Sequence, residues 1–465
     1  MPNLLDAVYL LALAGAAPYL AWQRWRFGKY RRGWWQKLTG SLPPRTSPQP
    51  CAWIHAVSVG EVLLLRPFLA QMRQQHSEWR VVLTVGTESG FDVARQIFPD
   101  LTVAFAPLDF SWAIRQAFER LHPNLIILAE LELWPNWLRE AARRHVPVFV
   151  INARLSDRSY RRYRWLGRAF RRYTQAVHLW AVQNQTYAQR LRTLGVPTSR
   201  IVVSGSMKFD GVTTQRLDPR TLRLARLFGL TPPGPPGRTE LVWVAGSTQE
   251  PEEEIVLKVY ARLQQRWPEL RLVLVPRHRE RFDSVAQLIQ QHGWPVLRRS
   301  SLSEPAGVRD GSPQSPTTHP VSSPVPSARA LSSEKLPIIL VDTLGELADV
   351  WGLADVAFVG GSFGNRGGQN MLEPAALGVP TVFGPNVWNF REIAHELLQA
   401  QAAWQVHSPD ELYDALSALL SDPLRRQELG ARARQTVLAH QGAVYRTLLA
   451  LRPWLIPSVA ARLAA

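Results

Sequence analysis

Short apolar runs alternate with longer stretches of helical periodicity along most of the chain. A strand that is apolar at nearly every position belongs to a parallel sheet with helices on both faces, and repeated strand–helix alternation builds such a sheet. Five runs in the first half predict strands, at Ala52–Ala56, Val81–Val85, Leu125–Leu128, Val148–Ile151 and Leu179–Val182. We therefore predict an α/β domain with a doubly wound parallel sheet.

A second series of apolar runs follows the Pro- and Gly-rich stretch Leu230–Gly237. Its predicted strands are Leu241–Ala245, Leu270–Val275, Ile338–Val341, Val356–Val359 and Thr381–Phe383. Helical periodicity then continues at Asp410–Leu420 and Leu424–Leu448, and we expect this region to pack back on the first domain. The predicted fold class is α/β, with two facing Rossmann-like domains.

These patterns divide the chain into four parts. Residues 1–36 form an N-terminal membrane anchor, 37–229 the first Rossmann-like domain, 230–430 the second, and 431–465 a C-terminal helical segment. Within the second domain, residues 300–336 are rich in Ser, Pro and Thr and lack hydrophobic periodicity. Because such a segment buries too little apolar surface to offset its ordering entropy, we predict a disordered insertion there.

The apolar run Leu4–Trp22 is followed by Arg and Lys residues interleaved with Trp and Tyr. About nineteen helical residues reach roughly 28 Å, close to the hydrocarbon thickness of a bilayer, although Asp6 and Pro18 interrupt the run. The charges follow the run, which disfavours cleavage as a secretory signal and places the later chain in the cytoplasm by the positive-inside rule. The run either spans the membrane or lies in its interface, and docking on its own domain is the alternative.

The formal net charge is +17, from 54 Lys and Arg against 37 Asp and Glu, while 46% of residues are hydrophobic. This composition is that of a folded protein, and its basic excess suits nucleic acid, an anionic membrane or a phosphorylated substrate. The basic and aromatic cluster beside the apolar run favours a membrane surface, and we find no nucleic-acid-binding motif. Cys51 is the only cysteine, so it forms no intramolecular disulfide or multi-cysteine metal site, and we interpret it as an inert core residue.

Candidate chemistry begins where the first predicted strand runs into a helix, from His55 to Val62. Gly60 allows a substrate to approach the backbone, and Ser58 lies in the same turn. Glu61 occupies the helix start, where the dipole favours an ionised carboxylate suited to act as general base on a substrate hydroxyl. Capping of the helix by Glu61 is the structural alternative. We interpret His55 as a satisfied core histidine.

A second acidic motif, Glu130 to Asn136, follows the third predicted strand. Glu130 and Glu132 are two positions apart, so their carboxylates lie on the same face of an extended chain. They are suited to orient a hydroxylated sugar, and a solvated loop is the alternative. Because ligands of doubly wound folds bind at the carboxyl ends of the strands, we expect these motifs to line the cleft between the two domains.

The second half offers two candidate anion sites. Pro276, Arg277 and His278 follow the predicted strand Leu270–Val275, and the planar guanidinium of Arg277 is suited to bind phosphate, although a solvated helix start gives the same pattern. Five glycines lie within the nine residues Gly360–Gly368, which predicts amides exposed to a nucleotide phosphate, and a tight irregular turn is the alternative. The candidate donor-binding residues here are Gly361, Ser362, Gly367, Gly368, Asn370 and Glu373, with Glu373 placed to accept hydrogen bonds from ribose.

Six motifs in this order carry a resemblance to a known family: His55–Glu61, Glu130–Asn136, Asn152–Ser156, Gly205–Asp210, Pro276–Phe282 and Gly360–Pro374. Over nearly the whole chain they resemble the 3-deoxy-D-manno-octulosonic acid (Kdo) transferases of lipopolysaccharide biosynthesis. The resemblance implies an inner-membrane glycosyltransferase of the GT-B fold. It implies transfer of Kdo from CMP-Kdo to the lipid A precursor, lipid IVA, with inversion and without a required metal or cofactor.

By the same resemblance, Glu61 matches the catalytic base, and Glu132, with Glu130 beside it, matches an essential acidic position. Arg277 and the segment Gly360–Glu373 match the CMP-binding side. The implied substrate-binding residues are Ser58, Gly60, Glu130 and Lys208. Transfer is then expected to need closure of the two domains on each other.

Three positions depart from the family pattern. Gln249 and Gln369 stand where the family often has His, and Leu131 stands where it often has Thr or Ser. Glutamine donates and accepts hydrogen bonds but does not titrate, so any protonation role of these positions is lost. The 300–336 insertion has no counterpart in compact members. The alternative functions are a GT-B transferase that uses a UDP-sugar and a non-catalytic membrane-surface binding protein.

Overall fold

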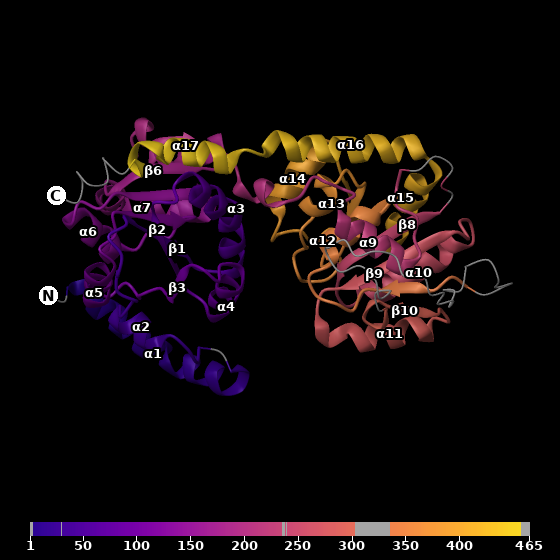
Figure 1. Cartoon of the computed structure of the whole chain (residues 1–465), viewed down its shortest axis with the longest axis horizontal. Helices are drawn as coiled ribbons and strands as arrows, with labels where there is room; N and C mark the ends of the chain where they lie inside the picture. Colours follow the sequence, from indigo (N-terminus) through magenta and orange to yellow (C-terminus); the bar gives the residue numbers. More distant parts are fainter. Residues whose placement is uncertain (1–2, 29, 235–237, 239, 303–334, 457–465) are drawn as a thin grey trace, which may run out of the picture. The chain divides into compact units, whose positions relative to one another are not determined.

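The structure is a computed structural model that describes residues 3–28, 30–234, 238, 240–302 and 335–456. The chain divides into two compact units. The first combines residues 1–211 with 440–465, and the second consists of residues 212–439. Each unit is built around a seven-stranded parallel sheet (Figure 1). Most of the predicted insertion at 300–336 lies outside the described residues.

The sheet of the first unit has the strand order β3-β2-β1-β4-β5-β6-β7. The chain builds outward from β1 in one direction and then returns to place β4 on the other side of β1. In doubly wound sheets ligands bind at the carboxyl ends of the two strands at this switch point. The strands are β1 (Cys51–Ala56), β2 (Arg80–Val85), β3 (Thr102–Phe105), β4 (Leu125–Ala129), β5 (Val148–Ala153), β6 (Val177–Val182) and β7 (Ile201–Val203).

Helices cover both faces of this sheet, as the uniformly apolar strands require. The helices of the first unit are α1 (Leu4–Phe27), α2 (Trp34–Thr39), α3 (Val59–Gln75), α4 (Glu88–Ile97), α5 (Ser111–Leu121), α6 (Pro135–Arg143), α7 (Asp157–Thr174), α8 (Gln185–Thr193) and α17 (Ala443–Leu455), with short 3-10 turns η1 (Thr198–Arg200) and η2 (Met207–Gly211). Within the described residues, α1 is the one helix long and apolar enough to cross a membrane.

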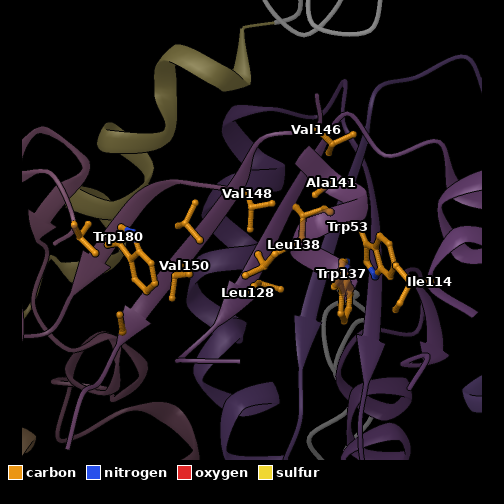
Figure 2. Close-up of a cluster of buried hydrophobic side chains, with 14 of the residues drawn as sticks. Trp53, Ile114, Leu128, Trp137, Leu138, Ala141, Val146, Val148, Val150 and Trp180 are labelled. Carbon is orange, nitrogen blue, oxygen red and sulfur yellow. The ribbon is translucent and has the colours of Figure 1, made fainter. Parts of the chain in front are cut away.

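Alternate residues of each central strand enter different cores. In β1, Trp53 belongs to the cluster beneath α5 and α6, while Ile54 belongs to the cluster beneath α3 and α17. The rings of Trp53 and Trp137 lie 4.5 Å apart in the first of these clusters (Figure 2). Cys51 is fully buried and unpaired, and burial raises the pKa of its thiol to about 11, which agrees with an inert core role.

The second unit repeats the architecture with the strand order β10-β11-β9-β8-β12-β13-β14. Its switch point lies between β8 and β12. The strands are β8 (Leu241–Thr248), β9 (Leu270–Pro276), β10 (Val296–Arg298), β11 (Ile338–Leu340), β12 (Val356–Val359), β13 (Thr381–Phe383) and β14 (Trp404–Gln405). The helices are α9 (Pro219–Phe228), α10 (Glu252–Gln264), α11 (Phe282–Gln291), α12 (Leu347–Val350), α13 (Leu372–Ala376), α14 (Arg391–Gln399), α15 (Pro409–Ser421) and α16 (Pro423–His440), with 3-10 turns η3 (Arg279–Arg281), η4 (Arg299–Ser301) and η5 (Trp351–Leu353).

The end of the chain differs from the predicted helix Leu424–Leu448. The helix breaks between α16 and α17, where Gly442 adopts a left-handed conformation with φ of 90°. Asp210 fixes the break, because its carboxylate accepts hydrogen bonds from the Gly442 and Val444 amides, both at 2.6 Å. The apolar periodicity continues across the break, which explains why the sequence pattern alone does not reveal it.

Candidate active site

The first group of site residues lies at the switch point of the first sheet. Glu61 occupies the first turn of α3, directly after β1. Its Oε2 accepts a hydrogen bond from the Val57 amide at 2.7 Å, and its Oε1 accepts one from Ser58 Oγ at 3.0 Å. The carboxylate is therefore turned back over the start of its own helix, where it binds the residue before the N-cap and the hydroxyl of the N-cap Ser58 rather than forming a capping box. Gly60 is exposed beside it.

The two other acidic side chains follow β4, the strand paired with β1. Glu130 adopts a left-handed conformation with φ of 58°, and its amide donates to the Ile151 carbonyl at 2.9 Å, which turns the chain sharply as it leaves the strand. Glu132 follows in a half-buried loop. Both glutamates act electrostatically on Glu61, so the structure brings these three predicted residues together.

Burial raises pKa values in the acidic group formed by Glu61, Glu130 and Glu132. It raises the pKa of Glu61 to about 7, and the negative charges of Glu130 and Glu132 act in the same direction against the hydrogen bonds from Val57 and Ser58. Burial and the charge of Glu130 also raise the pKa of Glu132. A carboxylate that titrates near neutral pH is matched to proton abstraction from a hydroxyl at that pH.

His55 and Lys208 lie on either side of this group in the chain. His55 is buried in β1, with Nδ1 3.2 Å from the Thr84 carbonyl oxygen, and burial lowers its pKa to about 4. It is a neutral core residue, as predicted. Lys208 lies half-buried in η2, which contacts α3. The Met207 amide beside it donates to Asn152 Oδ1 at 3.0 Å.

The second group lies at the switch point of the second sheet, where the glycine-rich segment leaves β12. Here the buried Glu252 at the start of α10 is the organising residue. Its carboxylate accepts hydrogen bonds from the amides of Gly361 at 2.6 Å, Ser362 at 2.7 Å and Phe363 at 2.9 Å. It also accepts from the Gln249 amide at 3.0 Å.

This arrangement corrects part of the sequence analysis. The amides of Gly361 and Ser362 were expected to face a phosphate, but Glu252 already satisfies them. The Gly368 amide is likewise used, because it donates to the Gly361 carbonyl at 2.7 Å. Gly367 has φ of 83°, and a Cβ there would overlap the Trp388 ring. The glycines therefore build a tight turn around a protein carboxylate, which is the alternative left open above.

Beside this turn, Glu373 interacts with Asn370, Trp351 and Arg277. Asn370 Nδ2 donates to one Glu373 carboxylate oxygen at 3.0 Å, and Trp351 Nε1 donates to the other at 3.2 Å. Burial raises the pKa of Glu373, and the positive charge of Arg277 opposes the shift. The exposed Arg277 follows β9 directly and its amide donates to the Thr248 carbonyl at 2.9 Å.

The remaining predicted residues of this group bracket Arg277. Pro276 is the last, buried residue of β9, and His278 is exposed ahead of η3. Among the described residues, no group of three or more His, Cys, Asp or Glu side chains is arranged to hold a metal ion. The arrangement thus offers an exposed guanidinium after β9 and a half-buried carboxylate with an amide side chain after β12, and these two strands flank β8.

Sequence reasoning missed Glu252 and Trp351. Glu252 lies in the acidic run Glu252 to Glu254. From sequence alone, a glutamate at a helix start is interpreted as a favourable charge for the helix dipole. Only the approach of the glycine-rich segment, more than a hundred residues later, shows that the carboxylate is a hydrogen-bond acceptor for that segment. Trp351 looks like a core residue, and most of its surface is indeed buried.

Two parallel sheets of Rossmann type, each with site residues at its switch point, form the GT-B fold. A glycosyltransferase from Rickettsia africae has a similar fold, with a TM-score of 0.53 at 9% identity over 88% of this chain and all of that chain. The family described as 3-deoxy-D-manno-octulosonic-acid transferase matches residues 25–211.

The 3-deoxy-D-manno-octulosonic acid transferase of Haemophilus influenzae is 33% identical over 89% of this chain and 88% of its own length. The C-terminal CMP-Kdo binding domain of WaaA from Acinetobacter baumannii is 28% identical, covering 47% of this chain and 96% of that domain with a TM-score of 0.37. The chain belongs to the Kdo transferase family and is a glycosyltransferase of lipopolysaccharide biosynthesis.

Proposed function

We propose that this protein transfers Kdo from CMP-Kdo to a lipid A precursor, with inversion at the anomeric carbon and with Glu61 as the general base. The single observation that carries the assignment of the base is the position of Glu61 beside Glu130 and Glu132 at the ends of the paired strands β1 and β4, where burial raises its pKa to about 7. A carboxylate with an ordinary pKa of about 4.3 is a poorer acceptor for a hydroxyl proton. The assignment of Kdo as the transferred sugar rests on membership of the family.

The proposed reaction is a single displacement at the anomeric carbon of Kdo. The acceptor hydroxyl oxygen forms a bond to the anomeric carbon of Kdo while its proton passes to the Glu61 carboxylate. The bond between that carbon and the CMP phosphate oxygen breaks, and CMP leaves with the electron pair. Glu132 and Glu130 then hold the acceptor sugar and keep the pKa of Glu61 high, while Ser58 and Gly60 shape the turn and Lys208 supplies a cation on the acceptor side.

The donor is assigned to the second unit. Arg277 is the exposed cation at the end of β9 and suits the phosphate of CMP. Asn370 and Glu373 provide an amide and a carboxylate for the ribose hydroxyls or the base. Side-chain cations and amides of this kind stabilise a departing phosphate without a metal ion, so we propose metal-independent transfer. Catalysis requires that the donor held here reaches Glu61.

The acceptor is a lipid, which agrees with the exposed apolar helix α1 ahead of the first sheet. We propose that the protein works at the inner membrane with its two units on the cytoplasmic side, because the basic residues that follow α1 suit the negative surface potential of the cytoplasmic leaflet. The expected partners are CMP-Kdo, the lipid A precursor and membrane lipids. A nucleic-acid partner is not expected.

Replacing Glu61 by glutamine tests the base. Glutamine keeps the size and an acceptor oxygen for the Val57 amide but does not take up a proton. We expect kcat for transfer from CMP-Kdo to lipid IVA to fall by about 10²- to 10⁴-fold, with CMP affinity unchanged. The control is Glu78→Gln on the first unit, which is expected to keep full activity. Near-normal turnover of Glu61→Gln contradicts the assignment.

Competition between nucleotides tests the donor. CMP is expected to inhibit transfer and to raise the midpoint of thermal unfolding, while UDP at the same concentration does neither. Inhibition by UDP alone indicates a UDP-sugar donor instead. Failure of both nucleotides to bind supports a non-catalytic membrane-surface protein.

A further inference from the structure

The start of helix α1 is fastened to the first unit. Asp6 is 1% exposed, and its carboxylate accepts hydrogen bonds from the Ser111 amide at 2.7 Å and from Ser111 Oγ at 2.6 Å. Asn3 Nδ2 donates to Asn136 Oδ1 at 2.8 Å, and the Tyr9 hydroxyl donates to Asp109 at 3.1 Å. Four polar contacts at the start of α1 thus lead to the segments that begin α5 and α6.

The chain just after α1 is fastened to the same unit. The Arg32 amide donates to Glu88 at 2.8 Å, and its guanidinium pairs with Asp92. Gln36 Oε1 accepts from the Phe105 amide at 3.1 Å. From Asp6 to Arg24 the helix rises about 27 Å, nearly the hydrocarbon thickness of a bilayer. If α1 crossed a membrane, Asp6 would lie on the side opposite the unit and every contact at its start would be broken.

One face of α1 is less exposed than the other along the length of the helix. Less exposed positions recur every three to four residues on the face that carries Asp6 and Tyr9, at Asp6, Tyr9, Leu13, Ala16, Leu20 and Gln23. The opposite face carries exposed apolar side chains, which include Leu4, Val8, Leu11, Tyr19, Trp22 and Trp25. Leu11 is 74% exposed and Trp25 is 81% exposed. Polar contacts hold the first turns of α1 to the unit, and the exposed apolar face, which carries Trp22 and Trp25, is the side that suits a membrane interface.

The positive charges at the end of α1 indicate which kind of membrane surface its apolar face binds. Arg24, Arg26 and Arg31 are all exposed at the end of α1, next to the exposed Trp25 and Trp35. Arginines beside tryptophans at the level of the headgroups favour anionic phospholipids. We propose that α1 lies flat in the surface of an anionic bilayer, docked on its own unit, and does not span the membrane.

This inference rests on the proposed function for the need to meet a membrane-held acceptor. Asp109, which accepts from Tyr9, also accepts from the amides of Asn136 at 3.0 Å and Trp137 at 2.9 Å, and so holds the start of α6. That turn directly follows the loop that carries Glu132. A flat α1 therefore sets the bilayer surface beside the acidic residues on the acceptor side.

A disulfide lock tests the inference. Asp6→Cys with Ser111→Cys places two thiols where the carboxylate and hydroxyl now meet, and a disulfide between them holds the start of α1 on the unit. We expect the oxidised protein to form this bond in membranes, to stay bound to them, and to transfer Kdo at the rate of its reduced form. Cys51 is buried and does not compete. Absence of the disulfide in membranes, or release of the locked protein from them, overturns the inference.

Vesicle binding supplies a second measurement that does not depend on activity. Leu11→Asp is expected to lower affinity for vesicles of phosphatidylethanolamine and phosphatidylglycerol by at least tenfold, and 0.5 M NaCl is expected to weaken binding of the unsubstituted protein. The control, Leu449→Asp on the exposed side of α17, keeps the affinity. Equal affinities of the two variants contradict a docking face on α1. Because disulfide formation and vesicle binding are both read without a nucleotide, failure of either is distinct from failure of the CMP competition.

Discussion

At the scale of single residues, the acidity of Glu61 follows from its neighbours. Burial raises its pKa to about 7, the charges of Glu130 and Glu132 add to the rise, and the Val57 amide and Ser58 hydroxyl oppose it. The same carboxylate therefore holds the turn before α3 and has a pKa near neutral pH. The two roles are compatible, because a carboxylate has lone pairs beyond the two used by Val57 and Ser58.

The pH dependence of transfer follows with a definite sign. The base must be ionised, so kcat/KM is expected to rise with pH through an apparent pKa near 7 and to level off above it. Glu132→Gln removes a negative charge and is expected to shift this pKa downward, whereas Ser58→Ala removes a hydrogen bond to the carboxylate and shifts it upward. Profiles of kcat/KM against pH measure both shifts. Opposite displacements would show that another group titrates.

Arg277 gives the second prediction at this scale. Arg277→Ala removes the exposed cation assigned to the CMP phosphate, and we expect KM for CMP-Kdo to rise about tenfold or more because a charge-assisted hydrogen bond is lost. Arg277→Lys keeps the charge without the planar fork and restores part of the loss. Arg279→Ala, an exposed cation two residues later, is the control and leaves KM unchanged. Unaltered donor kinetics in Arg277→Ala contradict the assignment.

At the scale of elements, the turn after β12 is held by one side chain from α10. Glu252 is 0% exposed and binds amides on two loops, so the glycine-rich segment has the shape of an anion site already filled by the protein. A Cβ at Gly360 would lie 2.8 Å from a Glu252 carboxylate oxygen and 2.7 Å from backbone atoms of Ser247 and Thr248. Gly360 is thus required by this close approach.

Glu252→Gln tests this role. The glutamine NH2 group would face amide donors where an oxygen now accepts, leaving buried amides unsatisfied at a cost of about 1–3 kcal/mol each. We expect a lower midpoint of thermal unfolding and at least tenfold weaker CMP binding, because the donor-side turn loosens. Glu254→Gln, on the exposed face of the same helix, is the matched control. Normal CMP binding in Glu252→Gln would separate the turn from donor recognition.

The strands that the sequence pattern predicted differ in their position in the sheets from those that it did not. All ten predicted strands are present, and the four that the sequence pattern did not reveal are β3, β7, β10 and β14. These four are the edge strands of the two sheets. An edge strand has a neighbour on one side only, and β7, β10 and β14 are half-buried throughout. Their side chains need not form an uninterrupted apolar run.

At the scale of the whole molecule, the chain returns to its first unit after building the second. Helix α17 supplies buried side chains, Leu448, Leu451 and Leu455 among them, to the core beneath α3. Trp79 Nε1 in that unit donates to the Leu455 carbonyl at 2.9 Å. The core of the first unit therefore stays incomplete until α17 is in place.

Leu451→Ala tests this dependence. Leu451 is 1% exposed, and truncating a buried leucine costs about 2–5 kcal/mol. We expect a lower unfolding midpoint for the first unit and unchanged CMP binding by the second. Leu449→Ala on the same helix removes a side chain that is 51% exposed and is expected to cost much less. Calorimetry with and without CMP follows both units, and equal losses in the two variants would contradict a core role for α17.

The sequence by itself determined the strand–helix alternation, the central strands and the positions of Glu61, Glu130, Glu132 and Arg277 at strand ends. These features are local, because a buried strand is apolar wherever it lies and a motif at its end is read from neighbouring residues. The family resemblance was also available at this level, since it rests on ordered short motifs.

The tertiary structure alone decided which distant groups meet. It turned the amides of Gly361 and Ser362 toward Glu252 rather than toward a ligand, gathered three glutamates at one switch point, and fastened Asp6 to Ser111. Each of these outcomes depends on residues far apart in the chain and on burial, which sets hydrogen-bond partners and pKa values. No local pattern carries that information, because burial is a property of the packed fold.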